Sequence, residues 1–280
     1  MRIGTHVSIA GGLWNAPGNA KKVGAEAFQI FSRSPHGGPV KEITKEIQKQ
    51  FKDEMDKNGL DTFYIHTPYF INFASNKSNI YHGSISVVRQ ELERGSQIGA
   101  RAIMTHLGSF GELSEKEGLQ RVSEAVEKVM KGYKGTTQLL LEISAGAGKI
   151  VGDTFEELAA ILDNKILKGR NVGICLDTCH LFASGYDLRT KKSVEDTLKK
   201  FDKLIGYDKL VMVHANDSKA ECGNHLDRHE HIGQGKIGLE GFKLLANHKI
   251  FGKLDWILET PKDEPSWDPM NIATLKKLRK

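Results

Sequence analysis

The sequence is poor in the features that mark secreted, membrane-bound or disordered proteins. Three cysteines, Cys175, Cys179 and Cys222, are too few for a framework of paired disulfides, which favours a reduced, cytoplasmic protein. No apolar run is long enough to span a bilayer, and the first residues lack a charged stretch followed by an apolar core, so we expect neither a membrane span nor a signal peptide. Hydrophobic residues at 39% and charged residues at 27% give an ordinary globular balance, which excludes disorder.

Charge and chain length leave the function open. The net charge of +5 permits a polyanionic partner without requiring one. No Pro/Gly/Ser-rich linker or change in composition divides the 280 residues, so we expect a single domain over residues 1–280.

Short apolar runs rich in β-branched and aromatic residues alternate with longer stretches of helical period. Eight runs have the pattern of strands: Arg2–Val7, Glu26–Phe31, Thr62–Thr67, Arg101–His106, Gln138–Ile143, Val172–Asp177, Lys209–Ala215 and Leu254–Glu259. Between them, apolar side chains recur every three or four residues, as in Ile43, Ile47, Phe51 and Met55. Ser114 with Glu117, Asp153 with Glu156, and Asp268 before Pro269 are expected helix starts.

Strict alternation of about eight strands with about eight helices predicts a parallel sheet covered on both faces. Eight such units favour a closed (β/α)₈ TIM barrel, with an open doubly wound sheet as the alternative. The longest non-periodic segments, Ser32–Val40 and Asp217–Gly238, both follow strands and are expected at the C-terminal face of the barrel.

Seven of the eight expected strands end in or beside a histidine, aspartate or glutamate, and a barrel brings all these ends to one mouth. A single such residue is more often a packed histidine or a helix cap, but a cluster of carboxylates needs cations to offset their repulsion. Because the set mixes imidazole and carboxylate groups, we expect zinc or manganese rather than calcium.

The segments after strands six and seven add to this set. His180 follows Asp177 closely, and Asp227 and His229 are two apart, which in extended chain directs both side chains to the same side. The candidate ligands number nine: His66, His106, Glu142, Asp177, His180, His214, Asp227, His229 and Glu259. Nine ligands suit two or three metal ions with a shared carboxylate, an arrangement suited to phosphoryl chemistry.

Several motifs in chain order resemble the endonuclease IV family of zinc-dependent apurinic/apyrimidinic (AP) endonucleases, which have a TIM-barrel fold. They include Gly4-Thr-His-Val-Ser8, His66-x-x-Tyr69, Glu142-x-x-Ala145-Gly146, Leu176-Asp-Thr-Cys-His180, His214-x-Asn-Asp217-Ser-Lys219, Asp227-Arg-His229 and Leu258-Glu259-Thr260. The resemblance runs from residue 3 to about residue 262, nearly the whole chain.

The resemblance implies three zinc ions and cleavage of duplex DNA on the 5′ side of an abasic site, leaving a 3′-hydroxyl and a 5′-deoxyribose phosphate. His66, His106 and Glu142 would hold the first ion. Glu142 would bridge to the second, with Asp177, His214 and Glu259, and His180, Asp227 and His229 would hold the third. Glu142 and Glu259 would orient the attacking water.

The segments expected to contact DNA depart from the family pattern. Residues 32–39 lack the family's tryptophan, residues 107–110 replace its Pro-Gly-x-His, and Ile143 stands where Asn or Thr is usual. Tyr69 and Phe70 fit the aromatic and apolar pair that fills the space around a flipped nucleotide. Arg33, Lys219 and Arg228 lie in loops at the expected mouth and are proposed phosphate contacts.

The remaining histidines receive structural roles. His6 is expected to pack or to support the ligands from behind. His225 and His231 are expected to be solvated loop residues, and His36, His82 and His248 to lie at the surface.

Two other functions remain open at this stage. A metal-dependent sugar isomerase or epimerase shares the barrel and the acidic strand ends, but it has no need of the set His180, Asp227 and His229. A non-catalytic DNA-binding barrel is disfavoured because it needs no intact set of nine ligands. We expect a monomer acting on double-stranded DNA with abasic sites, without membrane association.

Overall fold

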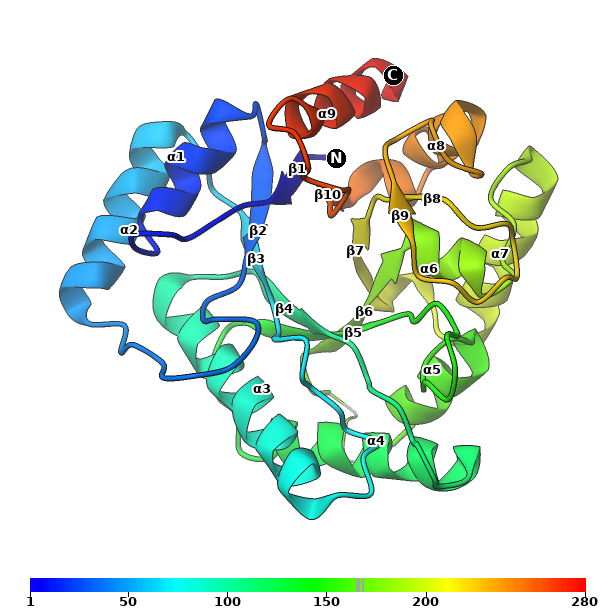
Figure 1. Ribbon diagram of the computed structural model, residues 1–280, viewed down its shortest axis with the longest axis horizontal. Coiled ribbons are helices and arrows are strands. Elements are labelled where there is room, and N and C mark those ends of the chain that lie inside the picture. The colour runs from blue at the N-terminus through cyan, green and yellow to red at the C-terminus, as the bar shows by residue number, and fades with distance from the viewer. Residues whose placement is uncertain (165–166, 168) are drawn as a thin grey trace.

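Eight parallel strands close into a barrel surrounded by helices in the computed structural model, which describes residues 1–164, 167 and 169–280 (Figure 1). The strands are β1 (Ile3–His6), β2 (Ala27–Ile30), β3 (Phe63–His66), β4 (Ala102–Thr105), β5 (Gln138–Glu142), β6 (Val172–Asp177), β7 (Leu210–His214) and β10 (Asp255–Leu258). Pairing of β1 with β10, with Ile3 opposite Trp256, joins the first strand to the last. The closed barrel expected from the sequence is therefore confirmed, and the open sheet is excluded.

The helices follow the strands and cover the outside of the barrel. They are α1 (Asn15–Lys22), α2 (Lys45–Asn58), α3 (Ser78–Ile98), α4 (Glu115–Met130), α5 (Phe155–Leu162), α6 (Thr178–Ala183), α7 (Lys191–Leu204), α8 (Gly238–Ala246) and α9 (Trp267–Leu278), with short 3₁₀ turns η2 (Tyr207–Lys209) and η3 (Phe251–Lys253). The apolar stripe of α2 buries Phe51 and Met55, as its spacing predicts. Within the described ranges, no helix combines the length and apolar character needed to cross a membrane.

One of the three expected helix starts is confirmed and two are wrong. Ser114 and Glu117 form the capping box of α4. At α5 the cap is Thr154, whose side chain accepts from Glu157 N–H, one residue later than expected. In α9 the helix begins before Asp268, whose carboxylate instead accepts hydrogen bonds from Thr5 and Lys262. At α9 the partners that engage Asp268 include Thr5, which lies far away in the sequence and has no local signature.

Two hydrophobic layers hold the barrel. The larger lies between the strands and the helices, and a smaller one fills the barrel interior with Tyr64, Met104, Leu140, Met212 and Ile257 among others. Because alternate residues of a strand face inward, this filled interior leaves only the strand ends free for a site.

The segment after β7 contains a small hairpin that the sequence does not predict. Strands β8 (Asp217–Ser218) and β9 (His229–Glu230) pair antiparallel. The buried carboxylate of Asp217 accepts hydrogen bonds from the backbone N–H groups of Ser218, Gly233, Gly235, Ile237 and Gly238. This carboxylate fixes the path of the chain that carries Asp227 and His229.

Candidate metal centre

All nine candidate ligands lie at the carboxyl ends of the barrel strands or in the segments just after them. Each strand end fixes its side chain through the parallel pairing of the barrel, as for His66 opposite Met104 and Asp177 opposite His214. Several of the nine line a cavity of about 760 Å³ at the mouth, together with Phe31, Tyr69 and Phe70. This volume is in the range of small-molecule and cofactor sites.

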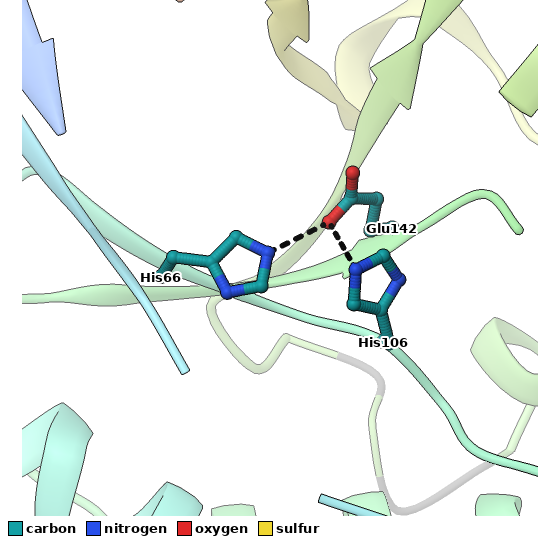
Figure 2. A group of neighbouring side chains, drawn as sticks. All are labelled: His66, His106 and Glu142. Carbon is teal, nitrogen blue, oxygen red and sulfur yellow. Dashed lines mark ion pairs between the residues drawn. The ribbon is translucent and has the colours of Figure 1, made fainter. Parts of the chain in front are cut away.

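Three side chains from consecutive strands form the first group (Figure 2). His66 and His106 both direct Nε2 toward Oε2 of Glu142, at 3.4 and 3.8 Å. One ligand atom from each residue lies within 4.8 Å of those of the other two, which is close enough for all three to bind one ion.

Glu142 also belongs to a second group through its other oxygen. Its Oε1 lies 2.7 Å from Nδ1 of His214, which is 3.3 Å from Oε2 of Glu259. Asp177 completes this group of four. Because the two oxygens of Glu142 face different groups, this carboxylate is placed to bridge two ions.

The third group joins α6 to the β9 hairpin. Oδ1 of Asp227 lies 3.3 Å from Nε2 of His180 and 3.3 Å from Nε2 of His229. His180 lies in the first turn of α6 rather than in a loop, and its backbone N–H is held by the side chain of Asp177. The structure thus brings together all nine residues expected from the sequence, in the three sets that the resemblance implies.

Four of the five imidazoles are oriented by a hydrogen bond. In each, the bond is made by the ring nitrogen that points away from the ligand group. The acceptors are Thr67 O for His66, Ile143 O for His180, Glu259 O for His229 and Gln29 Oε1 for His214. A carbonyl oxygen accepts only from N–H, so the facing nitrogen of each neutral ring presents its lone pair to the centre. This is the arrangement that metal-binding histidines require.

Three buried side-chain nitrogen or oxygen atoms of the described residues lack a hydrogen-bond partner, and all three belong to this centre. They are Glu142 Oε2, His180 Nε2 and His229 Nε2. Buried polar atoms are nearly always paired, so three unpaired ligand atoms around one cavity are suited to bind a cation. The residues therefore fit divalent metal ions.

The carboxylates of the centre are held in the ionised form. Burial alone would raise the pKa of Glu259, but the imidazoles of His214 and His66 lower it to about 2. Burial likewise opposes the ionised form of Glu142, whose pKa nevertheless falls well below its ordinary value beside His214 and His106. At His180 burial alone would lower the pKa, but Asp177 and Asp227 raise it to about 10. Without ions, protons on His66, His180 and His214, whose pKa values are all raised, balance the carboxylates, and metal binding would displace them.

Two buried cysteines lie next to the centre. Cys175 lies near Glu142 and His214, and Cys179 near Asp177 and His229. Burial raises the pKa of the Cys175 thiol to about 12 and raises that of Cys179 as well. In the metal-free protein both are therefore neutral, buried thiols.

Sequence reasoning missed two buried amides. Gln29 in β2 contacts His214 and Glu259. Asn216 donates from Nδ2 to Asp177 at 2.6 Å and accepts at Oδ1 from the backbone N–H of Glu259. The available signal was an amide inside or next to an otherwise apolar strand, since such a group must find buried partners.

The expected DNA contacts divide into two classes. Tyr69 and Phe70 are exposed at the mouth, at 63% and 43%, and Tyr69 packs edge-on against Phe31. Lys219 is half exposed near Glu230, and Arg228 is exposed.

Arg33 does not lie where a phosphate contact was expected. Its side chain is only 7% exposed and donates to Glu91 at 2.6 Å and to Gln90 at 2.9 Å. Its guanidinium is already paired within the protein.

The other histidines mostly follow expectation, and His231 does not. His6 lies 4.0 Å from Glu259 and forms a hydrogen bond with Gln29. The exposed histidines are His36, His82 and His225, and His248 is partly buried.

His231 was expected in solvent, but it is 5% exposed and stacks on Trp267 at 3.8 Å between ring centres. Its burial depends on α9, which lies far along the chain.

Comparison with known proteins shows the family of the chain. The model of the family described as "Xylose isomerase-like TIM barrel" matches residues 17–280. A "Probable endonuclease 4" from Halothermothrix orenii is 41% identical over 262 residues, 94% of each chain. The crystal structure of endonuclease IV from Thermus thermophilus superimposes with a TM-score of 0.87 at 31% identity and covers 99% of this chain and 98% of that one. A D-tagatose 3-epimerase-like protein superimposes at 0.72 with 20% identity, covering 99% of this chain and 96% of that one, which shows the fold alone.

Proposed function

The chain belongs to the endonuclease 4 group of the xylose isomerase-like TIM barrel family, and we propose that it cuts duplex DNA on the 5′ side of apurinic/apyrimidinic sites. The products would be a 3′-hydroxyl and a 5′-deoxyribose phosphate. The observation that carries this proposal is the set of three ligand groups around one cavity, two of them joined by Glu142.

Zinc is the metal that this ligand set favours, with about three ions per chain. A mixture of imidazole and carboxylate ligands suits zinc, whereas calcium prefers oxygen ligands alone. His66, His106 and Glu142 would hold one ion; Glu142, Asp177, His214 and Glu259 a second; and His180, Asp227 and His229 a third. One chain supplies all nine ligands, so the proposed enzyme needs no second chain to complete its centre and would act as a monomer.

The bound metals would supply Lewis acidity toward the phosphodiester and lower the pKa of the attacking water. Glu142 and Glu259 remain ionised at neutral pH, so their oxygens can accept hydrogen bonds from that water and orient it toward phosphorus. Attack forms a new P–O bond and breaks the P–O3′ bond, and the proton lost by water is matched by one gained at O3′. Phe31, Tyr69 and Phe70 form an apolar part of the cavity wall beside the ligands.

Double-stranded DNA is the proposed partner. Tyr69 and Phe70 project at the rim of the cavity, where an aromatic and an apolar side chain can fill the space left by an abasic nucleotide. Lys219 and Arg228 are the proposed phosphate contacts. The enzyme would act in the cytoplasm, where its DNA substrate lies.

A sugar isomerase or epimerase on the same fold is the weaker alternative. Such a reaction moves a proton on a small carbohydrate and leaves the group of His180, Asp227 and His229 without a role. Exposed Tyr69 and Phe70 likewise suit a macromolecule better than an enclosed sugar.

The decisive experiment is incision of a duplex that carries one reduced abasic analogue, with and without added zinc. We expect a cut 5′ to the lesion that ends in a 3′-hydroxyl, loss of activity after chelation and recovery with zinc. Metal analysis should give about three zinc per chain. No cut at the lesion by zinc-loaded protein, or a stoichiometry of one, would refute the proposal and favour the isomerase.

A further inference from the structure

β1 and β2 are the two barrel strands that contribute none of the nine ligands, yet β2 places a buried amide against them. Gln29 is fully buried and lies between Phe28 and Ile30 in a strand of four buried residues. Its neighbours in the barrel are His6 on β1 and Tyr64 on β3. A glutamine in this setting loses its hydration and must be satisfied by fixed partners.

Three partners satisfy the amide, and their chemistry fixes its orientation. Nε2 of Gln29 donates to Oε1 of Glu259, and also faces Nδ1 of His6 at 3.1 Å. Oε1 of Gln29 lies 2.8 Å from Nε2 of His214. A carboxylate only accepts hydrogen bonds, so the amide nitrogen must face Glu259 and the amide oxygen must face His214.

This orientation sets the proton positions of both imidazoles. The amide oxygen can accept only from N–H, so His214 carries a proton on Nε2. Nδ1, which lies 2.7 Å from Oε1 of Glu142, is then the ring nitrogen left to bind an ion. The amide nitrogen can only donate, so Nδ1 of His6 is the acceptor. At Glu259 the amide occupies Oε1 and leaves Oε2, the oxygen 3.3 Å from His214 Nδ1, for the centre.

We propose that Gln29 is the positioning residue of the second metal group, because one amide fixes the tautomer of His214 and selects the ligating oxygen of Glu259. The inference rests on the proposed metal centre, but it concerns affinity and ligand orientation rather than the reaction catalysed. Removing such a supporting partner typically weakens metal binding about 10–100-fold.

The proposal accounts for the residue type. A methionine of similar size would keep the packing but leave the His214 N–H and a Glu259 oxygen without partners. A glutamate would keep the acceptor for His214 and place a second carboxylate oxygen against Glu259, where the two charges repel each other.

The test is zinc affinity, measured by competition with a chromophoric chelator on the full chain, for wild type, Gln29→Met and Gln29→Glu. We expect about three zinc per chain in wild type, and one of the three about 10–100-fold weaker in each variant. Gln138→Met, in β5 outside the described centre, is the matched control and should bind zinc as wild type does. Thermal unfolding of the zinc-free proteins reports any loss of stability separately.

Nitrogen-15 spectra of zinc-loaded protein give a second measurement that packing alone would not change. In wild type, His214 should coordinate through Nδ1 with Nε2 protonated, and in Gln29→Met this single pattern should be lost. Wild-type zinc affinity and an unchanged His214 pattern in both variants would overturn the role of Gln29 and leave the proposed function intact. Wild-type protein that binds no zinc would overturn both.

Discussion

Nδ1 of His229 lies 3.0 Å from the backbone carbonyl oxygen of Glu259, so a ligand of the third group is oriented by the main chain of a ligand of the second. The two groups are thereby linked without sharing a side chain. Removal of His229 should consequently empty the third group while the backbone at Glu259 stays in place.

Changing His229 to alanine should lower the zinc content from about three to about two per chain, because Asp227 and His180 alone are too few ligands for tight binding. Metal analysis after dialysis measures this. His82→Ala, an exposed histidine on α3, is the control and should keep the full content. Full zinc content in His229→Ala would show that the third group is not a metal site.

Changing Tyr69 to alanine should reduce incision about 10–100-fold without loss of zinc, since aromatic stacking on nucleic acid contributes about 1–3 kcal/mol per base. Tyr69 is exposed and is not one of the nine ligands. Parallel measurement of cleavage rate and zinc content tests this. Leu239→Ala, another exposed apolar side chain, should leave both values unchanged. Wild-type incision by Tyr69→Ala would mean that the DNA is held elsewhere.

Changing Asp217 to asparagine should lower the free energy of unfolding by about 2–4 kcal/mol, because an amide nitrogen would face backbone N–H groups that the carboxylate now satisfies. Chemical denaturation measures the change. The exposed Asp208→Asn serves as control and should be neutral. Equal stability of the two variants would contradict the role given to Asp217.

Stability should also depend on pH through Glu157. Burial raises its pKa to about 7 from an ordinary 4.5; the Gly152 N–H opposes this shift and the carboxylate of Asp153 adds to it. Because the folded pKa is the higher one, unfolding releases a proton between these values, and stability falls as the pH rises from about 4.5 to about 7.

Changing Glu157 to glutamine should remove this loss. At pH 8 the variant should be more stable than wild type by at most roughly 3 kcal/mol, and at pH 4 the two should be equal. Glu156→Gln, one residue earlier and exposed beside Lys200, should give no such gain. A stability difference that does not change with pH would rule out titration of Glu157 as the cause.

The barrel could be predicted from the sequence because the alternation of strand and helix periods is a local pattern. Eight such units favour closure, which requires β1 to pair with β10. The nine candidate ligands were found for a related reason, since strand ends must meet at one mouth. Gln29 was missed because it is no ligand and its partners come from β7 and the end of β10. His231 and Arg33 were misjudged because α9 and α3 bury or pair them, and neither contact has a local signature.

Closure of the barrel by β1 and β10 has a consequence for the order of folding. The first ligand group comes from the neighbouring strands β3 to β5, so half a barrel can assemble it. The second and third groups need the end of β10 or the β9 hairpin, which are in place only when the chain is nearly complete. The first group thus needs only the part of the chain up to β5, whereas the other two also need residues beyond β7.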